Sequence, residues 1–503
     1  MTLADNSTIR RIIVLGGGSA GFLAALGLKA KMPDLPVSVI RSKDIGIIGV
    51  GEGSTISLTD YLHNYIKVNG RKFFEEGQPT WKLGLKFIWG TRPHFFYTFS
   101  GNQMDARIPE LTKPIGYYAD GEMEHAELYM SMMAQNRVFE RGPSGLPLQH
   151  KHIAYHVENE HFVKFLEAMA LERGIQIIDD TVSEVKQDDS GVTGLLLKSG
   201  CTEKADLYVD CSGFISFLLG KTLKEPFISF KSSLFCDRAV VGGWPRQGEP
   251  IQPFTTCETA NAGWCWQIEH EHRINRGYVY CSSFISDEEA EREFRALAPK
   301  VVNTRMVKFV SGRYERAWVK NVVAIGNAAG FVEPLEATAL GAIAVQSRIL
   351  ADTLVEGDRQ IRPSLVACYN THHAGYWDAI RGFIAIHYKF NERLNTPFWM
   401  ECREKTDLSV AQPLVEFYRE NGPTGYWGQG ILLHSADQFQ VGGYMTLLVG
   451  QRAPYHSGFK PSDSERQAFN AHRQRIRERA LRAMTSEELL AVIRSPAWQW
   501  EQR

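Results

Sequence analysis

The segment of residues 12–22 constrains the fold most strongly, because an apolar run, Ile-Ile-Val-Leu, leads directly into the pattern Gly-x-Gly-x-x-Gly and then into a sequence rich in Ala and Leu. In a strand–turn–helix unit, Gly16 allows the tight turn, Gly18 lets the backbone approach a pyrophosphate, and Gly21 lets helix pack on strand. The helix N-terminus offers N–H groups to the anion. A purely structural glycine turn is the alternative. The pattern predicts dinucleotide contacts from Gly16, Gly17, Gly18, Ser19, Ala20 and Gly21.

The composition is that of an ordinary globular protein acting on small molecules. Of 503 residues, 44% are hydrophobic and 22% charged, and 56 Lys and Arg balance 57 Asp and Glu. A net charge near zero provides no field to recruit nucleic acid or anionic lipid. The eight cysteines include no Cys-x-x-Cys pair and no zinc-type spacing, which is typical of reduced thiols and predicts no metal site. Residues 1–11 lack an apolar signal core, and no apolar run reaches about 18 residues, so we expect a cytoplasmic protein without a membrane span.

A second predicted strand, residues 37–41, ends where dinucleotide sites of this type place an acidic residue on the ribose. Arg41 occupies that position. Either Ser42 or a backbone group binds the ribose, or Arg41 faces a phosphate of another nucleotide. We favour Ser42.

Three further segments favour a resident FAD over a mobile nicotinamide. Residues 49–55 are rich in glycine, residues 206–213 form a buried strand running into a small-residue turn, and residues 322–330 repeat the order strand, tight turn, helix start. Between them, residues 154–173 are predicted to be an amphipathic helix and residues 174–185 a strand. The remaining predicted cofactor contacts are Glu52, Val182 through its backbone at the adenine, Gly326, Asn327 and Leu340.

The chain is predicted to be an α/β protein with a discontinuous FAD-binding, Rossmann-type domain. Residues 8–90, 150–215 and 305–350 form this domain, and residues 91–149 and 216–304 form an interleaved β-sheet region for the substrate. Residues 351–503 form a mostly helical C-terminal region, in which the charged tail 463–494 has helical spacing.

The motifs together resemble the flavin-dependent halogenases of the tryptophan-halogenase family, relatives of the flavin monooxygenases. The resemblance spans residues 11–397. It depends on the glycine turn, Gly-Val-Gly-Glu at 49–52, Lys-Leu-Gly-Leu-Lys-Phe at 82–87, Trp-x-Trp-x-Ile at 264–268 and Phe-Val-Glu-Pro-Leu-Glu at 331–336.

The resemblance implies a relay in which reduced FAD, O2 and halide give hypohalous acid, which migrates to a lysine. By position that lysine is Lys82, and Lys86 is its rival. A buried ammonium can hydrogen-bond the oxidant, or a neutral amine can carry the halogen as a haloamine. Glu336 matches the family glutamate that orients the oxidant and removes the ring proton. Glu333 is interpreted as a helix-start acid without a catalytic role.

Two positions depart from the family pattern. The family continues with Ser-Thr-Gly, whose backbone amides bind halide, whereas this chain has Ala-Thr-Ala; Thr338 and Ala339 are the candidate halide residues. Loss of the glycine at 339 could forbid the required backbone angles. Glu269 replaces the proline after Trp-x-Trp-x-Ile, the motif that separates halogenases from hydroxylating relatives.

The resemblance implies an aromatic substrate, an indole or a phenol. Tyr97 and Phe99 occupy the strand that flanks the substrate in the family, and Trp264 and Trp266 share one face of a strand, where they can separate substrate from flavin. Aromatic core packing is the alternative for both pairs. The aromatic lid of enzymes acting on free tryptophan is not found in residues 426–428 or 444–448.

We therefore expect a flavin-dependent halogenase supplied with reduced FAD by a separate flavin reductase, since no second nicotinamide motif is present. The alternatives are an FAD-dependent aromatic hydroxylase that does not use halide and an FAD-holding protein without turnover. The oligomeric state stays open, with a homodimer as one arrangement.

Overall fold

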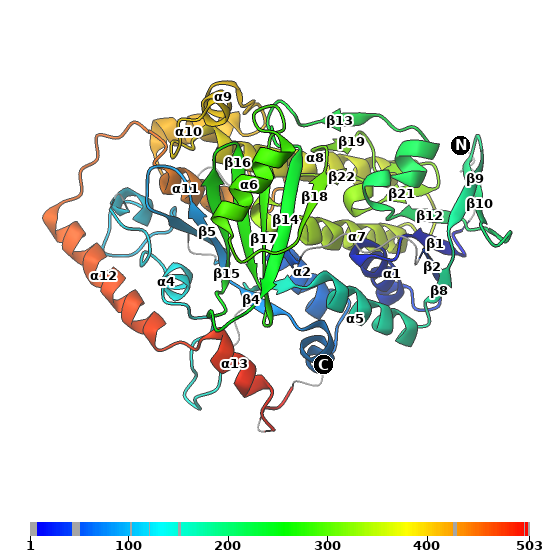
Figure 1. The fold of residues 1–503 in the computed structure, drawn as a ribbon, viewed down its shortest axis with the longest axis horizontal. Helices are drawn as coiled ribbons and strands as arrows, with labels where there is room; N and C mark the ends of the chain where they lie inside the picture. Colours follow the sequence, from blue (N-terminus) through cyan, green and yellow to red (C-terminus); the bar gives the residue numbers. More distant parts are fainter. Residues whose placement is uncertain are drawn as a thin grey trace.

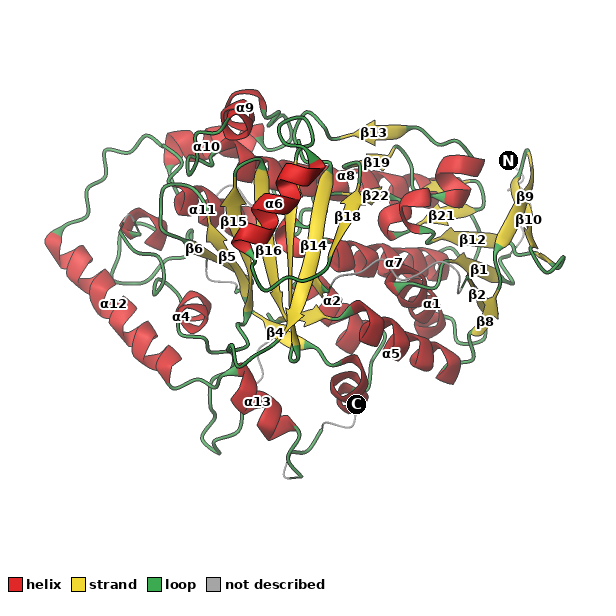
Figure 2. Cartoon of the chain, viewed as in Figure 1, coloured by secondary structure: helices red, strands yellow, loops and turns green. Residues whose placement is uncertain are grey.

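The computed structural model describes residues 8–42, 51–100, 103–119, 121–148, 152–425, 430–496 and 498–500. Two large sheets organise these residues, with helices packed around both (Figure 1). Figure 2 shows the two sheets side by side, with the long helix α12 along the opposite margin of the molecule from the first sheet. The predicted α/β class is confirmed.

The first sheet has six strands in the described residues, in the order β20-β21-β12-β1-β2-β8. All of its pairings are parallel except that of the edge strand β20. Every residue of β1 is buried, as expected for a parallel strand covered on both faces. The strands are β1 Ile12–Leu15, β2 Val37–Arg41, β8 Gln176–Asp179, β12 Leu207–Asp210, β20 Trp318–Val319 and β21 Val322–Ala324.

The second sheet has seven strands in the described residues, in the order β18-β14-β17-β16-β15-β5-β6, and is antiparallel except where β15 runs beside β5. Its strands are β5 Gly84–Ile88, β6 Phe95–Thr98, β14 Arg238–Pro245, β15 Phe254–Ala260, β16 Gly263–Glu269, β17 Arg273–Tyr280 and β18 Thr304–Lys308.

Three small sheets complete the β-structure of the described residues. The one that matters for the site is β3-β7-β4, formed by β3 Glu52–Gly53, β7 Ala154–Val157 and β4 Thr80–Lys82. The others are β9 Val182–Asp188, β10 Gly191–Leu197 and β11 Thr202–Glu203, and β13 Phe227–Ser229, β19 Gly312–Tyr314 and β22 Gly330–Phe331.

The helices follow the apolar periodicity and the capping signals of the sequence. Ser286, Ser462 and Thr485 each form a capping box with a glutamate three residues later, which fixes the starts of α6, α12 and α13. The helices are α1 Ser19–Lys31, α2 Ile56–Asp60, α3 Gly70–Lys72, α4 Leu128–Ala134, α5 Asn159–Glu172, α6 Asp287–Leu297, α7 Ala339–Glu356, α8 Pro363–Lys389, α9 Pro397–Lys405, α10 Gln412–Asn421, α11 Gln440–Gln451, α12 Asp463–Leu481 and α13 Ser486–Ile493.

Helix α7 is long and apolar enough, by length and composition alone, to cross a membrane. It packs on α1, and 61% of its apolar window is buried inside the protein, so it is a core helix. Ala and Leu suit both a membrane-spanning helix and a buried helix of a globular protein, and only the packing of the helix distinguishes the two.

Two predicted segments differ from the structure. Residues 154–157 form the strand β7 and not the first turn of a helix, because they pair with β3 and β4; the helix begins at Asn159. Residues 174–185 do not form one strand: β8 ends at Asp179 and β9 begins at Val182, in a different sheet. The predicted domain limits remain a prediction, and β5, within residues 8–90, is hydrogen-bonded into the second sheet.

Candidate active site

Three of the predicted cofactor segments meet at one edge of the first sheet. The turns after β1, β12 and β21 all leave the carboxyl ends of parallel strands, the usual ligand-binding edge of such a sheet. Gly16 has a φ of +126°, and a Cβ built on it would lie 2.3 Å from the carbonyl oxygen of Cys211, so only glycine fits. A Cβ on Gly326 would lie 3.2 Å from that of Ala20, which places the first and last turns side by side.

The N-terminus of α1 fits the pyrophosphate of a dinucleotide. Gly18 caps this helix without a side-chain hydrogen bond, and a Cβ built on it would meet no atom within 4 Å. The first N–H groups of the helix lack intrahelical acceptors and face this open space. Ser19 and Ala20, predicted cofactor contacts, form the first turn of α1.

The structure shows the contacts of Arg41 and Ser42, the two side chains considered for the nucleotide. Its guanidinium donates to Glu167 and to Asp179, the latter at 2.7 Å, so its charge is already paired. Its stem covers Gly17. Ser42 accepts a hydrogen bond from Thr181 at 2.7 Å, one residue before Val182 and the start of β9. The ribose contact of Ser42 or of a backbone group therefore stays a prediction, while the charge of Arg41 is engaged by two carboxylates.

Only part of the predicted Gly-Val-Gly-Glu block is described, because Gly49 and Val50 lie outside the described residues. Glu52 accepts a hydrogen bond from Asn159, and burial raises the pKa of its carboxyl group. The next residue, Gly53, lies in the same small sheet as Lys82. This segment therefore joins the predicted FAD side to the lysine. Of the remaining predicted contacts, Asn327 lies in the turn after β21 and Leu340 in the first turn of α7.

Lys82 lies at the end of β4 with 0% of its surface exposed. Its Nζ donates to the carbonyl oxygen of Ser54 at 3.1 Å and lies 5.2 Å from the ring centroid of Phe99. Burial lowers the pKa of this amine to about 8, and the nearby Glu336 partly opposes that shift. The result is an amine that is neutral in part of the molecules near neutral pH, which is what a nucleophilic nitrogen requires.

Glu336 approaches the same place from the turn before α7. It is 1% exposed and adopts a left-handed backbone conformation, with φ at 71°. A Cβ built on Gly53 would lie 3.1 Å from Lys82 Nζ and 3.2 Å from the Cβ of Ala337. Lys82 and the Glu336 turn thus converge at Gly53, where only glycine leaves room between them.

Lys86, the rival lysine, lies elsewhere. It is partly exposed on β5, and its Nζ lies 6.0 Å from the ring centroid of Phe96. Its neighbour Phe87 points to the opposite face of the strand, where the ring lies 5.1 Å from that of His387. The face that carries Lys86 is therefore not the face that meets Glu336.

The tryptophans of the Trp-x-Trp motif lie on the face of the second sheet that is directed toward Glu336. Cys257, which is electrostatically coupled to Lys82 and Glu336, lies directly opposite Trp266 on the neighbouring strand. Trp264 is fully buried, and its Nε1 donates to Glu333 at 2.9 Å. The rings of Trp264 and Trp266 both belong to the hydrophobic core, so any barrier that they form is part of the core packing of the second sheet.

Glu333 differs from its predicted role as a helix-start acid. It is fully buried six residues before α7 begins, and it accepts hydrogen bonds from Trp264 and from the hydroxyl of Tyr388. Burial raises the pKa of its carboxyl group to about 7. Glu333 thus joins the turn before α7 to the second sheet and to α8.

The predicted substrate residues lie on β6 and just after it. Phe99 faces Lys82, and Tyr97 is 4% exposed, with its ring 5.7 Å from that of Phe383 on α8. Phe383 in turn stacks on Phe439 at 3.8 Å and meets Tyr444 edge to face at 4.8 Å. Sequence reasoning missed this contribution of α8 and α11, because no local pattern in either helix indicates which residues meet β6. Residues 426–428, one of the two segments searched for an aromatic lid, lie outside the described residues.

The predicted halide residues form the start of α7. Thr338 has right-handed helical angles, with φ at −79°, and Ala339 is the first residue of the helix. The left-handed angles of this segment fall on Glu336 and Ala337 and not on residue 339, and halide binding by Thr338 and Ala339 stays a prediction. The N–H groups of this first turn lack intrahelical acceptors and suit an anion.

Glu269, the second departure, is accommodated by a local ion pair. Its carboxylate is 2% exposed and accepts from Arg246 at 2.7 Å and from Gln267 at 2.8 Å, while its backbone oxygen accepts from Thr80 of β4. The side chain is therefore held by Arg246, and the backbone makes the contact to the strand of Lys82.

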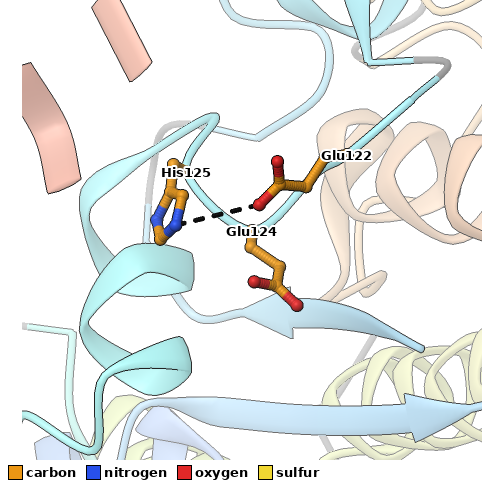
Figure 3. Close-up of side chains that lie close together, drawn as sticks. All are labelled: Glu122, Glu124 and His125. Atoms are coloured by element: carbon orange, nitrogen blue, oxygen red, sulfur yellow. Dashed lines mark ion pairs between the residues drawn. The ribbon is translucent and has the colours of Figure 1, made fainter. Parts of the chain in front are cut away.

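A separate cluster of ionisable groups lies in the segment before α4. Figure 3 shows Glu122, Glu124 and His125, with the ion pair between Glu122 and His125 at 3.8 Å. Glu124 also pairs with His94 at 2.6 Å, and Glu122 with Arg473 of α12. Because Glu122 pairs with Arg473 and Glu124 with His94, the cluster is accounted for as a polar network, and its Glu122–Arg473 pair attaches α12.

Comparisons with known proteins agree with this geometry. A family model described as tryptophan halogenase matches residues 11–461. Tryptophan 7-halogenase KtzQ of Kutzneria sp. (strain 744) is 31% identical over 455 residues, which cover 83% of each chain. The crystal structure of MibH, a lanthipeptide tryptophan 5-halogenase, has 37% identity and a TM-score of 0.88 over 99% of this chain and 96% of that one. BrvH, a flavin-dependent halogenase from Brevundimonas sp. BAL3, has 25% identity and a TM-score of 0.84, covering 96% and 99%.

A family model that spans most of the chain, relatives of this identity and the convergence of a buried lysine with a buried glutamate beside a dinucleotide edge all agree. The chain therefore belongs to the tryptophan halogenase family and is a flavin-dependent halogenase.

Proposed function

We propose that this enzyme uses reduced FAD, O2 and halide to form hypohalous acid, which is relayed to Lys82 for electrophilic halogenation of an electron-rich aromatic of the indole type. The observation that carries the proposal is the burial of Lys82 beside Glu336 and the ring of Phe99. In this proposal, the amine of Lys82 reacts with the small oxidant, while the larger FAD and the aromatic substrate stay on opposite sides of the amine.

The FAD is held by the turns at the carboxyl edge of the first sheet, with its pyrophosphate at the N-terminus of α1. When bound in its reduced form, it supplies the electrons that activate O2. Thr338 and Ala339 offer their backbone N–H groups to the halide. A separate flavin reductase delivers the reduced cofactor by diffusion.

Lys82 forms a nitrogen–halogen bond as hypohalous acid loses its hydroxyl group, which leaves as water with a proton from the amine. This step needs the neutral amine, and the pKa of about 8 supports it. The halogen then passes to the aromatic carbon as the electron pair of the broken bond returns to nitrogen, and the ring proton, once taken up by Glu336, is passed on to that nitrogen, which restores the neutral amine.

The substrate is proposed to be an indole presented by tryptophan, either within a peptide or free. The likeness to MibH covers nearly the whole of both chains at 37% identity, which supports a peptide-bound tryptophan. The relatives that act as tryptophan halogenases, such as KtzQ, support the free amino acid at 31% identity. A phenol, the other predicted type of substrate, is included in the assay described below.

The proposed location is the cytoplasm. All eight cysteines are free, and six of them are buried, as expected where thiols stay reduced.

The test is an assay of the purified protein with a flavin reductase, NADH and FAD. Free tryptophan, a tryptophan-containing peptide and a phenol are each offered with chloride, bromide or no halide, and products are identified by mass spectrometry. Halogenated indole is the expected result. Oxygenated product without halide would establish the hydroxylase instead, and hydrogen peroxide alone would leave an FAD-binding protein without turnover.

A further inference from the structure

Helix α8 reaches the turn before α7 with two consecutive side chains. His387 Nε2 lies 2.9 Å from Glu336 Oε1, and the hydroxyl of Tyr388 donates to Glu333. His387 and Glu336 are 0% and 1% exposed as side chains. Each carboxylate of the turn therefore has its own partner on one helix, away from bulk water.

The second nitrogen of His387 fixes the proton arrangement. Nδ1 lies 3.1 Å from the backbone oxygen of Phe383, and because a carbonyl oxygen only accepts, Nδ1 carries a proton. The contact between Nε2 and Oε1 then holds one proton, on nitrogen beside a carboxylate or on oxygen beside a neutral ring. In either state, Oε1 is engaged by the imidazole.

The other oxygen of Glu336 is left for the reaction. Among the described residues, the contact with His387 is the one hydrogen bond recorded for this carboxyl group. The imidazole is itself held in orientation by aromatic rings, with centroid distances of 5.1 Å to Phe87, 5.4 Å to Phe383 and 6.2 Å to Trp89.

The backbone of Glu336 makes such a partner necessary. Glu336 and Ala337 both have positive φ, at 71° and 55°, a left-handed conformation that is strained for a residue other than glycine. A turn of this kind persists only when its surroundings hold it. The hydrogen bond from α8 ties the strained residue to a long, buried helix.

We propose that His387 is a positioning residue for Glu336: it occupies one carboxyl oxygen and directs the other toward the reacting ring carbon. As the ring C–H bond breaks, its electron pair returns to the aromatic system, and the proton passes to the unoccupied oxygen of Glu336. This inference deepens the proposed function, since it rests on Glu336 being the base.

The test compares His387→Leu with His387→Gln. Leucine removes the contact, whereas the glutamine amide can still donate to Oε1 but cannot exchange a proton. We expect kcat to fall by roughly tenfold or more in His387→Leu, part of the ~10²–10⁴-fold that a general base contributes, with partial recovery in His387→Gln and little change in KM. With ring-deuterated indole, a primary isotope effect on kcat is expected in His387→Leu, because proton removal becomes slow.

His373→Leu is the matched control, because His373 is a buried histidine of the same helix whose Nε2 meets the backbone oxygen of Tyr314. It reports the cost of losing a buried imidazole from α8 without touching Glu336. Other titratable groups interact with Glu336, namely Lys82, Tyr97 and Cys257, so the isotope effect, and not the pH profile alone, is the deciding measurement.

Either of two outcomes overturns the inference. The first is that kcat falls no further in His387→Leu than in His373→Leu. The second is that His387→Leu slows the reaction without an isotope effect, although Glu336→Gln shows one. If Glu336→Gln itself keeps full activity, the proposed function of Glu336 fails instead. Absorbance of bound FAD and circular dichroism show which variants fold.

Discussion

At the residue scale, Lys82 shows how burial changes an ordinary side chain. An exposed lysine is a strongly hydrated cation, whereas this one has lost its water and is left beside one carbonyl oxygen and an aromatic ring. Its pKa of about 8 follows from that loss. Lys86, four residues away, has the same chemistry in isolation and stays partly exposed.

Lys82→Ala is expected to bind FAD normally and to lose halogenated product by on the order of 10²-fold or more, because the halogen then has no carrier. Lys86→Ala is the control and is expected to retain product formation. Product yield by mass spectrometry and FAD affinity by absorbance titration check both. Product from Lys82→Ala at the level of Lys86→Ala would remove Lys82 from the mechanism.

Burial of Lys82 also makes stability depend on pH. Its folded pKa of about 8 lies below the ordinary value of 10.5, so the folded protein gives up the proton first, and stability rises with pH between these values. Lys82→Met removes the charge. The variant is expected to exceed wild type by roughly 3 kcal/mol below pH 8 and to lose this advantage toward pH 10.5. Denaturant unfolding at pH 7, 9 and 10.5 measures the difference, and a constant offset across these values would contradict the pKa.

At the element scale, the start of α7 combines a left-handed turn and a helix N-terminus in one short segment. The turn that carries Glu336 and Ala337 is left-handed, and the helix that follows offers free N–H groups one residue later. The family glycine is replaced at a position where the backbone is already helical.

Ala339→Gly is therefore expected not to improve halide use. Glycine in a helix costs up to about 1 kcal/mol relative to alanine, so a slightly lower stability is the only expected effect. The bromide concentration giving half-maximal product is the measurement. A marked drop in that concentration would show that alanine obstructs the halide site.

The ion pair between Glu269, at the end of β16, and Arg246 is expected to affect the stability of the fold and not the reaction. Arg246 has its side chain 9% exposed and uses Glu269 as its carboxylate partner. Glu269→Ala leaves that charge with backbone oxygens alone and is expected to cost about 3 kcal/mol. Halogenation at a temperature where the variant is folded should persist. The double variant with Arg246→Met should recover part of the loss in denaturant unfolding, and a switch from halogenated to hydroxylated product would instead tie Glu269 to the choice of reaction.

At the scale of the whole molecule, the small sheet β3-β7-β4 is attached to the second large sheet, because Thr80 donates to the backbone oxygen of Glu269 and His156 is hydrogen-bonded to Thr255. Its first strand follows the FAD-side segment, its last carries Lys82, and Gly53 lies between Lys82 and the turn of Glu336. The proposed relay therefore predicts that the space beside Gly53 limits what reaches Lys82.

Gly53→Ala is expected to fill the space beside Lys82, since the new Cβ would lie 3.1–3.2 Å from three neighbours. Overpacking of this kind costs about 1–3 kcal/mol, so halogenated product should fall by roughly tenfold or more while FAD still binds. The ratio of hydrogen peroxide to halogenated product should rise. Gly121→Ala is the control, because a Cβ there meets nothing within 4 Å; an unchanged ratio in Gly53→Ala would place the passage elsewhere.

Local patterns in the chain were sufficient for the strand–turn–helix unit at Gly16 and for the helical spacing of the charged tail, where α12 and α13 form, because each depends on residues close in sequence. The preference for Lys82 came from the family resemblance and stays a prediction. They failed at residues 154–157, where an apolar, helix-compatible segment became a strand because β3 and β4 flank it. Glu333 was misassigned for a similar reason: its partners Trp264 and Tyr388 lie 69 and 55 residues away.

The amino-acid sequence by itself determined the class of protein, and it predicted the dinucleotide edge and the pair of residues proposed to carry the chemistry, since glycine spacing and motif order are local properties. Tertiary structure alone decided which lysine is buried, which backbone angles the departing residues adopt, and that His387 meets Glu336. Burial, strain and proton sharing arise from groups far apart in the chain, and no local pattern records which of them will meet.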